Sequence, residues 1–169
     1  MEITAVDMKD VLLQHVRKNP GIRYRELLRL TSLSNGVLTY HLAILEKSGK
    51  IQVRRKNRKT SYYPLDVSAK EADIIACLKA DTARQIILFM LDHDLCTFNE
   101  IVEHTGRAPS TVSWNLARLR DAGIMKVRYG EYSLYELTDR QAVTEILSRY
   151  KGNFLDRIVN NYTEMINEL

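Results

Sequence analysis

The chain has 169 residues, of which 45% are hydrophobic and 27% charged, and its formal net charge is +4. This composition is ordinary for a globular protein, and it argues against the collagen-like and disordered classes. No apolar run approaches the roughly 18 to 20 residues that a membrane span needs, and the N-terminus MEITAVDMKD lacks the pattern of a signal peptide. Two cysteines, Cys77 and Cys96, form neither a disulfide framework nor a CxxC motif. We therefore expect an intracellular, soluble protein without a membrane partner.

The charge is spread unevenly along the chain. Residues 1–66 hold 13 Lys/Arg and 6 Asp/Glu, a net charge of +7, whereas residues 67–169 hold 12 and 15, a net charge of −3. A basic part beside a slightly acidic one is typical of a protein whose basic part binds a polyanion. A solvated charged surface would give the same numbers, so charge alone leaves both readings open.

The chain also repeats itself with an offset of 74 residues. Residues 25–55, RELLRLTSLSNGVLTYHLAILEKSGKIQVRR, align with residues 99–129, NEIVEHTGRAPSTVSWNLARLRDAGIMKVRY, and share eight identities. After a gap of two residues, Tyr63 aligns with Tyr135. We interpret this as two copies of one structural unit of about 60 to 65 residues.

The first copy begins with an amphipathic helix over Val6–Arg17, which the breaker Asn19-Pro20-Gly21 ends. A short helix over Tyr24–Leu30 follows, and then a longer helix capped by Ser34 or Asn35. A 4-then-3 spacing of leucines gives the longer helix one apolar stripe. This stripe consists of Leu38, Leu42 and Leu45.

The second copy repeats this order, with helices over Thr82–Leu91 and Phe98–His104 and a longer helix capped by Ser110. We expect Pro109 to lie just ahead of that cap. Its apolar stripe consists of Val112, Leu116 and Leu119.

Each long helix is predicted to end at a glycine, Gly49 or Gly123, after which the hydrophobic period changes to two. This change predicts a β-hairpin in each copy. In the first hairpin, VRRKNRKTSYY, five of the six positions 54–59 are cationic, and the hairpin is two residues longer than its counterpart. The second hairpin carries the turn YGEYS, with a glutamate in place of cations.

The order helix, helix, turn, helix, hairpin is that of a winged helix-turn-helix. The predicted fold class is therefore mainly α with small β-hairpins (α+β), in two tandem winged helix-turn-helix domains plus a C-terminal helix. The predicted boundaries are residues 1–66, a helical connector at 67–80, a second domain at 81–139, and a helical segment at 140–169.

The pieces NPGIRYREL, NGVLTYHL and LEKSGKI resemble the winged-helix regulators of the ArsR and MarR type, above all their archaeal relatives. The second copy, with TVSWNLARLRDAGIM, is similar but looser. The resemblance covers residues 5–66 and 81–139. It implies a transcription regulator that binds specific sequences of duplex DNA. From the residues themselves we expect the protein to be cytoplasmic and nucleoid-associated, non-enzymatic, and without a cofactor or a metal.

The resemblance also implies that the longer helix enters the major groove and that the wing flanks the backbone or the minor groove. Asn35 would pair with an adenine or serve as a helix cap, and Arg23 and Arg25 would contact phosphate or extend into water. The DNA-binding residues predicted for the first copy are Arg23, Tyr24, Arg25, Asn35, Gly36, Val37, Thr39, Tyr40, Lys47, Arg54, Arg55, Lys56, Arg58, Lys59 and Tyr62.

The second copy offers a weaker DNA-binding surface, since residues 81–140 hold 7 cations and 9 anions. We expect the first copy to bind DNA and the second to make a secondary contact with DNA or with a protein partner, for which Trp114 would be an anchor. The residues predicted for that contact are Ser110, Thr111, Ser113, Trp114, Asn115 and Arg118.

Residues 140–169 carry a broad apolar stripe, which favours a homodimerisation helix over packing onto the chain's own second domain. Two rival functions remain open: a protein-interaction module, with a contact to the transcription machinery, and an RNA-binding winged helix. We find no signature of an enzyme, and the cluster Asp92, His93, Asp94, Cys96 and His104 is not expected to bind a metal.

Overall fold

The computed structural model describes residues 7–150 and 152, which divide into two compact units between Ala72 and Asp73. The first unit contains α1 (Met8–Lys18), β1 (Ile22–Arg23), α2 (Tyr24–Thr31), α3 (Asn35–Lys47), β2 (Gln52–Lys56), β3 (Lys59–Tyr63) and the start of α4 (Ala69–Leu78). The second unit contains the rest of α4, α5 (Asp81–Asp92), β4 (Cys96–Thr97), α6 (Phe98–Thr105), α7 (Pro109–Asp121), β5 (Met125–Arg128), β6 (Leu134–Leu137) and α8 (Arg140–Arg149).

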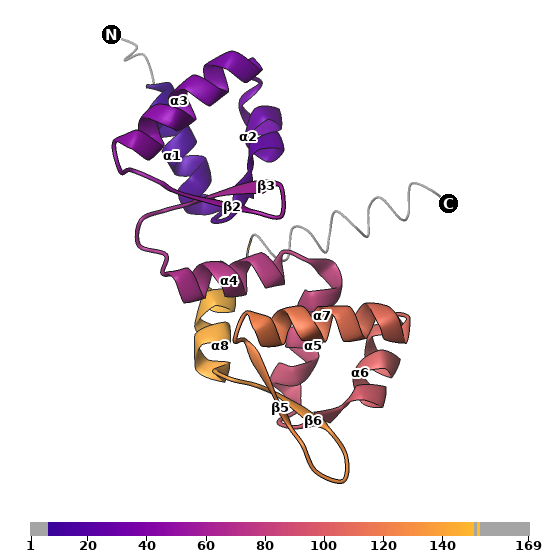
Figure 1. Cartoon of the computed structure of the whole chain (residues 1–169). Coiled ribbons are helices and arrows are strands. Elements are labelled where there is room, and N and C mark those ends of the chain that lie inside the picture. The colour runs from indigo at the N-terminus through magenta and orange to yellow at the C-terminus, as the bar shows by residue number, and fades with distance from the viewer. Residues whose placement is uncertain (1–6, 151, 153–169) are drawn as a thin grey trace. The chain divides into compact units, whose positions relative to one another are not determined.

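Both units have the same topology. Each has a three-stranded antiparallel sheet, of order β1-β3-β2 in the first unit and β4-β6-β5 in the second. Three helices, α1 to α3 or α5 to α7, pack on the sheet of their own unit (Figure 1). This confirms the predicted fold class, because each unit is a helix-turn-helix followed by a β-hairpin. We call β2–β3 (residues 52–63) the first wing and β5–β6 (residues 125–137) the second wing.

The apolar stripe of α3 lies in the core of the first unit, as its spacing predicted. Leu38, Leu42 and Leu45 are buried there. They pack with side chains from α1, α2 and the sheet, namely Leu12, Leu13, Val16, Ile22, Leu27, Ile51 and Tyr62. Burying this face leaves the opposite face of α3 to solvent, which decides what the helix can present to a partner.

The two long helices begin differently. Ser34 caps α3, as predicted, and its hydroxyl accepts a hydrogen bond from the backbone N–H of Val37. The prediction that Ser110 caps α7 is wrong, because α7 begins at Pro109 and Ala108 is its N-cap. Proline suits the first helical position, since its φ is already helical and its missing N–H would have no partner within the helix.

The strand register corrects the predicted alignment of the two wings. Val53 lies opposite Tyr62, and Val127 lies opposite Tyr135, so Tyr135 corresponds to Tyr62 and not to Tyr63. Six residues separate the paired residues Arg54 and Ser61, and five separate Arg128 and Leu134. The first wing is therefore one residue longer than the second, not two. Matching identical tyrosines misplaced the gap, because sequence identity does not define which residues face each other across a hairpin.

The breaker before α2 has a structural reason. Gly21 has a φ of 77°, in the left-handed region, and the Tyr63 ring lies 3.1 to 3.2 Å from where a Cβ on Gly21 would stand. Any other residue would be strained in its backbone and would press on the ring. Gly21 thus leaves room for the ring of Tyr63, the last residue of the first wing, to be buried against it.

Two arginines fix helix ends in the second unit. The buried guanidinium of Arg84 pairs with Asp81 at 2.6 Å and donates to the Leu78 carbonyl at 3.2 Å, so its charge is compensated. Arg140, at the start of α8, donates to the carbonyls of Met90 and Leu91 at the end of α5. These bonds hold α8 against the second unit, and Val143 and Ile146 of α8 are buried.

The remainder of the predicted dimerisation segment, residues 151 and 153–169, lies outside the described residues. The predicted stripe is therefore seen only in its first part, where α8 packs onto its own unit. None of the helices within the described part of the chain combines the length and the apolar character that a membrane span requires.

Candidate nucleic-acid interface

The solvent-exposed face of α3 mixes small, polar and large apolar side chains near its start. Burial of the leucine stripe leaves the predicted contact residues exposed, including Val37 and Tyr40, whose side chains are large and apolar. Tyr40 is 64% exposed. The exposed residues on this face are Asn35, Gly36, Val37, Thr39, Tyr40, Ala43 and Lys47.

Tyr24 joins the start of α2 to the start of α3. Its hydroxyl lies 3.0 Å from the main-chain carbonyl of Asn35, 3.1 Å from Asn35 Oδ1 and 3.1 Å from Thr39 Oγ1. Its ring is half-buried and packs against the core of the first unit. The sequence placed all three residues on the DNA-binding surface, but it gave no sign that they bond to one another.

Arg23 and Arg25 are exposed at the start of α2, as predicted. The carboxylate of Glu26 accepts a hydrogen bond from the backbone N–H of Arg23 at 3.4 Å. An acidic side chain in the first turn complements the positive end of the helix dipole. Glu26 therefore offsets part of the positive charge that Arg23, Arg25 and the helix dipole place at the start of α2.

The first wing ends in a two-residue turn at Asn57 and Arg58, which have φ values of 52° and 59°. Positive φ at both central residues is what a type I′ hairpin turn requires. Lys56 and Lys59 lie opposite each other at its base, and both are exposed, as is Arg58. Among the residues that the structure describes, no acidic side chain pairs with these three cations.

The other two cations of this wing bond to the protein. Arg55 forms two hydrogen bonds of 2.9 Å with Glu46, near the end of α3. The hydrogen bond from Arg55 lowers the pKa of Glu46 below its usual range, and the carboxylate raises the pKa of Arg55. Arg54 is half-buried and donates to the main-chain carbonyl of Ala69 at 3.4 Å. Two of the five cations predicted to bind DNA, Arg54 and Arg55, are therefore already engaged by groups of the protein.

Tyr62 is a second correction to the predicted contacts. Its side chain is 7% exposed and belongs to the core, between Val53 and Ile22 in the sheet. Burial raises the pKa of its hydroxyl. A period of two places alternate strand residues on opposite faces, and Tyr62 lies on the inner face. It supports the wing and has no exposed ring surface for DNA.

The corresponding helix of the second unit, α7, presents a different surface. Ser110, Thr111 and Ser113 are exposed, and Trp114 is 59% exposed, with the Arg118 guanidinium 4.7 Å from its ring centroid. The prediction for Asn115 is wrong. Its side chain is 4% exposed, and its amide donates to the Thr111 carbonyl at 2.8 Å.

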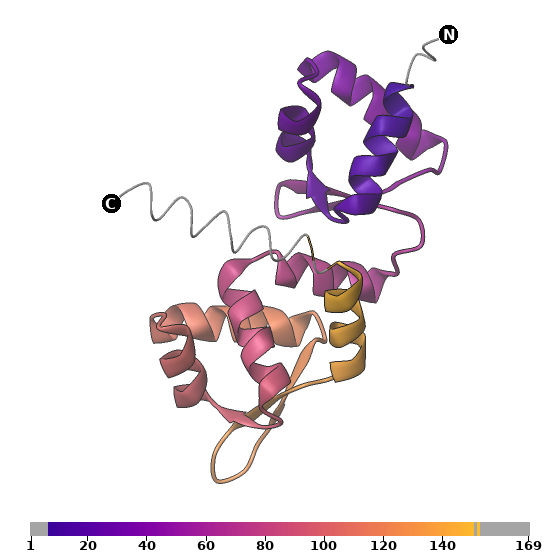
Figure 2. The same cartoon turned by 180° about the vertical axis from the view of Figure 1, so that it is seen from behind.

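The second wing neutralises its own cations. Glu136 lies 3.2 Å from Lys126 and 2.7 Å from Arg128, and the hydrogen bond from Arg128 lowers the pKa of this carboxyl. The loop at residues 129–133 extends away from the helices of its unit (Figures 1 and 2). Tyr129 and Tyr132 in this loop are strongly exposed.

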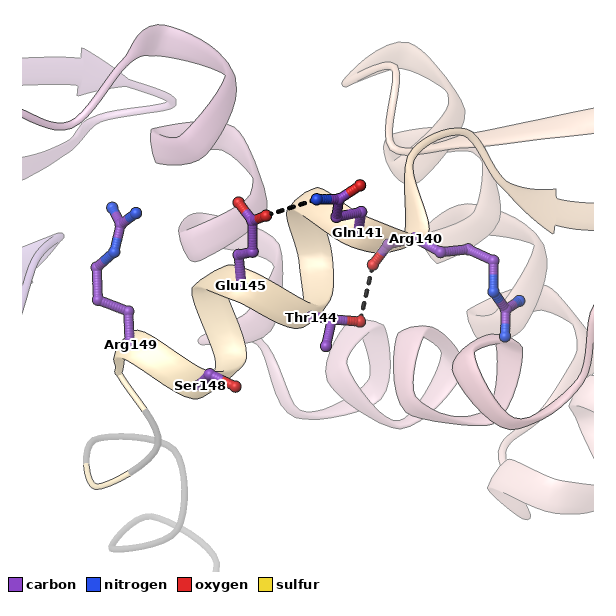
Figure 3. A pocket seen from close by; sticks show the side chains of 6 residues that line it. All are labelled: Arg140, Gln141, Thr144, Glu145, Ser148 and Arg149. Carbon is purple, nitrogen blue, oxygen red and sulfur yellow. Dashed lines mark hydrogen bonds between the residues drawn. The ribbon is translucent and has the colours of Figure 1, made fainter.

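One hollow lies along α8, where Figure 3 shows six lining side chains. All of them belong to this single helix. Gln141 donates to Glu145 at 2.9 Å, and the Thr144 hydroxyl donates to the Arg140 carbonyl at 2.8 Å. With these polar groups already engaged within one helix, the hollow offers no converging set for a ligand.

The histidine and cysteine cluster considered as a metal site is not assembled as one. Within the described ranges, no group of three or more His, Cys, Asp or Glu side chains could hold a metal ion. The rings of His93 and His104 instead pack against Phe89, with centroid distances of 4.2 and 4.4 Å.

Sequence reasoning missed the two acidic residues that decide which cations are available. Glu46 faces Arg55 from a different element, and no sequence spacing indicated that contact. Glu136 was detectable in principle. It lies directly opposite Lys126 across the predicted hairpin, so a correct register would have revealed the pair.

Comparison with known proteins agrees with this architecture. Residues 6–75 match a family model described as an N-terminal helix-turn-helix domain, and residues 81–127 match the model of the bacterial regulatory proteins of the arsR family. The two matches fall on the two units. The structure is thus that of two tandem winged helix-turn-helix units, the second of which is similar to the arsR family over residues 81–127.

Among curated relatives, the chain is similar to an uncharacterized HTH-type transcriptional regulator of Methanocaldococcus jannaschii. The two are 30% identical over 132 residues, which cover 73% of this chain and 33% of the relative. The chain thus spans about a third of the length of that relative.

Solved structures give weaker similarities. The transcriptional repressor BigR from Xylella fastidiosa is 21% identical with a TM-score of 0.43, over 47% of this chain and 82% of that one. Reduced HlyU from Vibrio cholerae is 26% identical with a TM-score of 0.41, over 48% and 87%. Both TM-scores fall below 0.5, so neither structure bears on the function or assembly of this chain.

Proposed function

We propose that this protein is a transcription regulator that binds specific sequences of duplex DNA, mainly through its first unit. In this proposal α3 enters the major groove and the first wing contacts the phosphate backbone or the minor groove. The second unit makes a secondary contact.

The observation that carries this proposal is the difference in available charge between the wings. Lys56, Arg58 and Lys59 are exposed on the first wing, with no acidic partner in the part of the chain that the structure describes. In the second wing Lys126 and Arg128 share Glu136. Cations that the protein does not neutralise can pair with DNA phosphates and release the counterions bound there. This release is the main source of a protein's affinity for DNA.

The exposed face of α3 supports the same assignment. Gly36 and Ala43 have small side chains, which allow the helix to approach the groove closely. Asn35 and Thr39 can hydrogen-bond to base edges, and Val37 can pack on a thymine methyl group. Tyr40 and Lys47 are placed to reach phosphates, as are Arg23 and Arg25 at the start of α2.

A neutralised first wing tests the proposal. The triple variant Lys56→Gln/Arg58→Gln/Lys59→Gln should lower duplex affinity on the order of 100-fold at low salt, and reduce the slope of log K against log salt by about three. The variant also removes the repulsion between Lys56 and Lys59, so the hairpin itself should not be weakened. Fluorescence anisotropy with a labelled duplex at several salt concentrations measures both quantities.

The matched control neutralises the second wing. Lys126→Gln/Arg128→Gln should lower affinity much less than the triple variant does, because Glu136 already offsets one of these two positive charges. Equal losses in the two variants, or a normal salt slope in the triple variant, would show that the first wing does not hold DNA. Separately, changing Asn35 or Thr39 should alter which sequence is preferred.

A second candidate function belongs to the second unit alone. Trp114, Tyr129 and Tyr132 are exposed aromatic side chains, and aromatic residues are enriched where proteins bind one another. A protein partner, such as a component of the transcription machinery, would use this surface. If a Trp114→Ala variant lost a partner in pull-down while keeping its DNA affinity, the second unit would be the interaction surface. Competition between duplex DNA and RNA tests the RNA-binding alternative.

Homodimerisation through residues 140–169 remains part of the proposal, and analytical ultracentrifugation of the full chain measures it directly. The sequence also resembles the archaellum regulator of the Euryarchaeota, another tandem winged-helix protein, and that narrower likeness stays a prediction. Genome-wide immunoprecipitation would identify the bound operators and genes.

A further inference from the structure

Three polar side chains of the first unit form a single hydrogen-bonded group. Tyr24 begins α2, while Asn35 and Thr39 lie one turn apart on the exposed face of α3. The Tyr24 hydroxyl is within 3.1 Å of both Asn35 Oδ1 and Thr39 Oγ1. Of these three residues, only Tyr24 packs its side chain against the hydrophobic core. The hydroxyl is therefore held from the inside, and the two exposed side chains bond to a fixed point.

The donor directions in this group follow from chemistry. A phenol has one proton to donate, and both oxygens that it meets on Asn35 can only accept. The Tyr24 proton therefore points to Asn35. The contact with Thr39 is then satisfied by the threonine hydroxyl, which donates its proton to the phenol oxygen. The bonds run in one direction, from Thr39 to Tyr24 to Asn35.

This direction sets what the surface offers to a partner. The main-chain carbonyl of Asn35, at 3.0 Å, and its Oδ1, at 3.1 Å, share the single Tyr24 proton. Oδ1 therefore faces Tyr24, the amide nitrogen lies on the other side of the side chain, and its two protons remain available as donors. With its own proton donated inward, Thr39 presents lone pairs and acts as an acceptor. A donor at Asn35 and an acceptor at Thr39 match an adenine N7 and an exocyclic amino group, respectively.

We infer that Tyr24 is a positioning residue for sequence recognition: it fixes the orientation of Asn35 and the donor direction of Thr39, and does not itself contact the nucleic acid. This inference rests on the proposed function of the first unit. It replaces the sequence-based prediction that Tyr24 contacts DNA directly. Without the hydroxyl, both exposed side chains would rotate freely, and each would pay more conformational entropy on meeting a base.

The second unit lacks this arrangement. With the offset of 74 residues, Phe98 stands in place of Tyr24, Pro109 in place of Asn35 and Ser113 in place of Thr39. Phenylalanine has no hydroxyl, and proline has no amide. Phe98 and Ser113 instead line a cavity of about 230 Å³ between α7 and the second wing. The polar group is thus specific to the unit that we propose reads DNA.

The variant Tyr24→Phe removes the hydroxyl and keeps the ring in the core. The probes are a duplex selected by the wild-type chain from a random-sequence library, a series of single base-pair changes in it, and an unrelated duplex. Discrimination against one or two of the base-pair changes should fall by about three- to tenfold, the range expected for a net hydrogen bond. Affinity for the unrelated duplex and the salt slope should stay as in the wild type.

Two further variants make the result specific. Thr39→Val should lose discrimination at the same base pair, and combining it with Tyr24→Phe should add little, because the two residues act as one group. Tyr135→Phe is the control. It removes a phenol hydroxyl from β6 of the second unit, outside the residues that we propose read DNA, so discrimination should not change.

The outcomes separate this inference from the function on which it rests. If the wild type shows no preference among duplexes, the proposed function fails and the inference falls with it. If the wild type discriminates and Tyr24→Phe discriminates equally well, only the inference is overturned. If Tyr24→Phe weakens every duplex to the same extent, Tyr24 is a backbone contact and not a positioning residue. Circular dichroism confirms that each variant is folded.

Discussion

The first and second wings share a strand register but hold their charges differently. In the first wing, residue 63, opposite Gln52, is a tyrosine whose ring is buried near Gly21. In the second wing, the residue at the corresponding position, opposite Lys126, is Glu136. This glutamate binds both cations of its wing, whereas the first wing leaves Lys56, Arg58 and Lys59 exposed. Glu136 thus compensates the cations of β5, whereas the three cations at the turn of the first wing have no acidic partner among the described residues.

The long helices show a parallel contrast, although their buried apolar stripes correspond position by position. Leu38, Leu42 and Leu45 match Val112, Leu116 and Leu119 in position and burial. Outside that stripe, α3 presents Asn35 and Thr39 held by Tyr24, whereas α7 presents Trp114 stacked on Arg118. The two units therefore fold for the same reasons and differ in what they expose.

The largest expected effect comes from the buried leucines of the two long helices. If the two units differ only in their surfaces, equivalent core substitutions should destabilise both units equally but only one should affect DNA binding. Leu45 and Leu119 are both fully buried, so Leu45→Ala and Leu119→Ala should each destabilise their own unit by about 2 to 5 kcal/mol. Leu45→Ala should also abolish tight DNA binding at temperatures where the first unit unfolds. Trp114, the single tryptophan of the chain, lies in the second unit. The unfolding midpoint measured by Trp114 fluorescence should therefore fall in Leu119→Ala and not in Leu45→Ala. Circular dichroism reports on both units, so it should detect the destabilisation in either variant.

Removing the carboxylate that pairs with Lys126 and Arg128 should make the second wing more like the first in the positive charge that it exposes. Glu136→Gln leaves Lys126 and Arg128 without a carboxylate, so duplex affinity should rise by about tenfold. The slope of log K against log salt should become steeper by about one or two, one for each cation released. Glu131→Gln, in the loop of the same wing, is the control, because it removes an equal charge without releasing a cation. An equal gain in both variants would mean that only net charge matters.

The turn of the first wing should show a trade between stability and binding. Arg58 has a φ of 59° where a type I′ turn favours glycine. Arg58→Gly should raise the free energy of unfolding of the first unit by roughly 1 kcal/mol, and lower the salt slope of DNA binding by about one. Asn57→Gly relaxes the same turn without a change in charge, so its salt slope should match the wild type. Thermal unfolding and salt titration measure the two effects.

The smallest effect concerns Arg55. Glu46→Gln should free this guanidinium for phosphate and raise duplex affinity by about threefold. Asp66→Asn, at an exposed position of the same unit, controls for net charge. If both variants gained equally, the Glu46–Arg55 pair would not limit the wing.

The same pair gives a pH dependence of known sign. Because Arg55 lowers the pKa of Glu46 in the folded state, the pair contributes stability above the unfolded-state pKa of this carboxyl. That contribution is lost as the pH falls through the lower, folded-state pKa. Acid unfolding of the first unit should therefore lose part of its pH dependence in Glu46→Gln. An unchanged acid transition would contradict this account.

The sequence by itself determined the architecture. Periodic leucines, the breaker at Asn19-Pro20-Gly21, the Ser34 cap and the change of period after Gly49 and Gly123 are local signals, and helices and hairpins form from local patterns. The repeat with an offset of 74 residues predicted two like units, and the count of cations identified the first as the basic one.

Only the tertiary structure decided which of those charges are available. The contacts of Arg55 with Glu46, of Glu136 with two cations, and of Tyr24 with Asn35 and Thr39 join different elements. Such contacts depend on how helices and strands cross, which no spacing along the chain encodes. The burial of Tyr62 and Asn115 likewise follows from which face of an element meets the core. The chain's local patterns thus define its parts, and their packing defines the surface that they present.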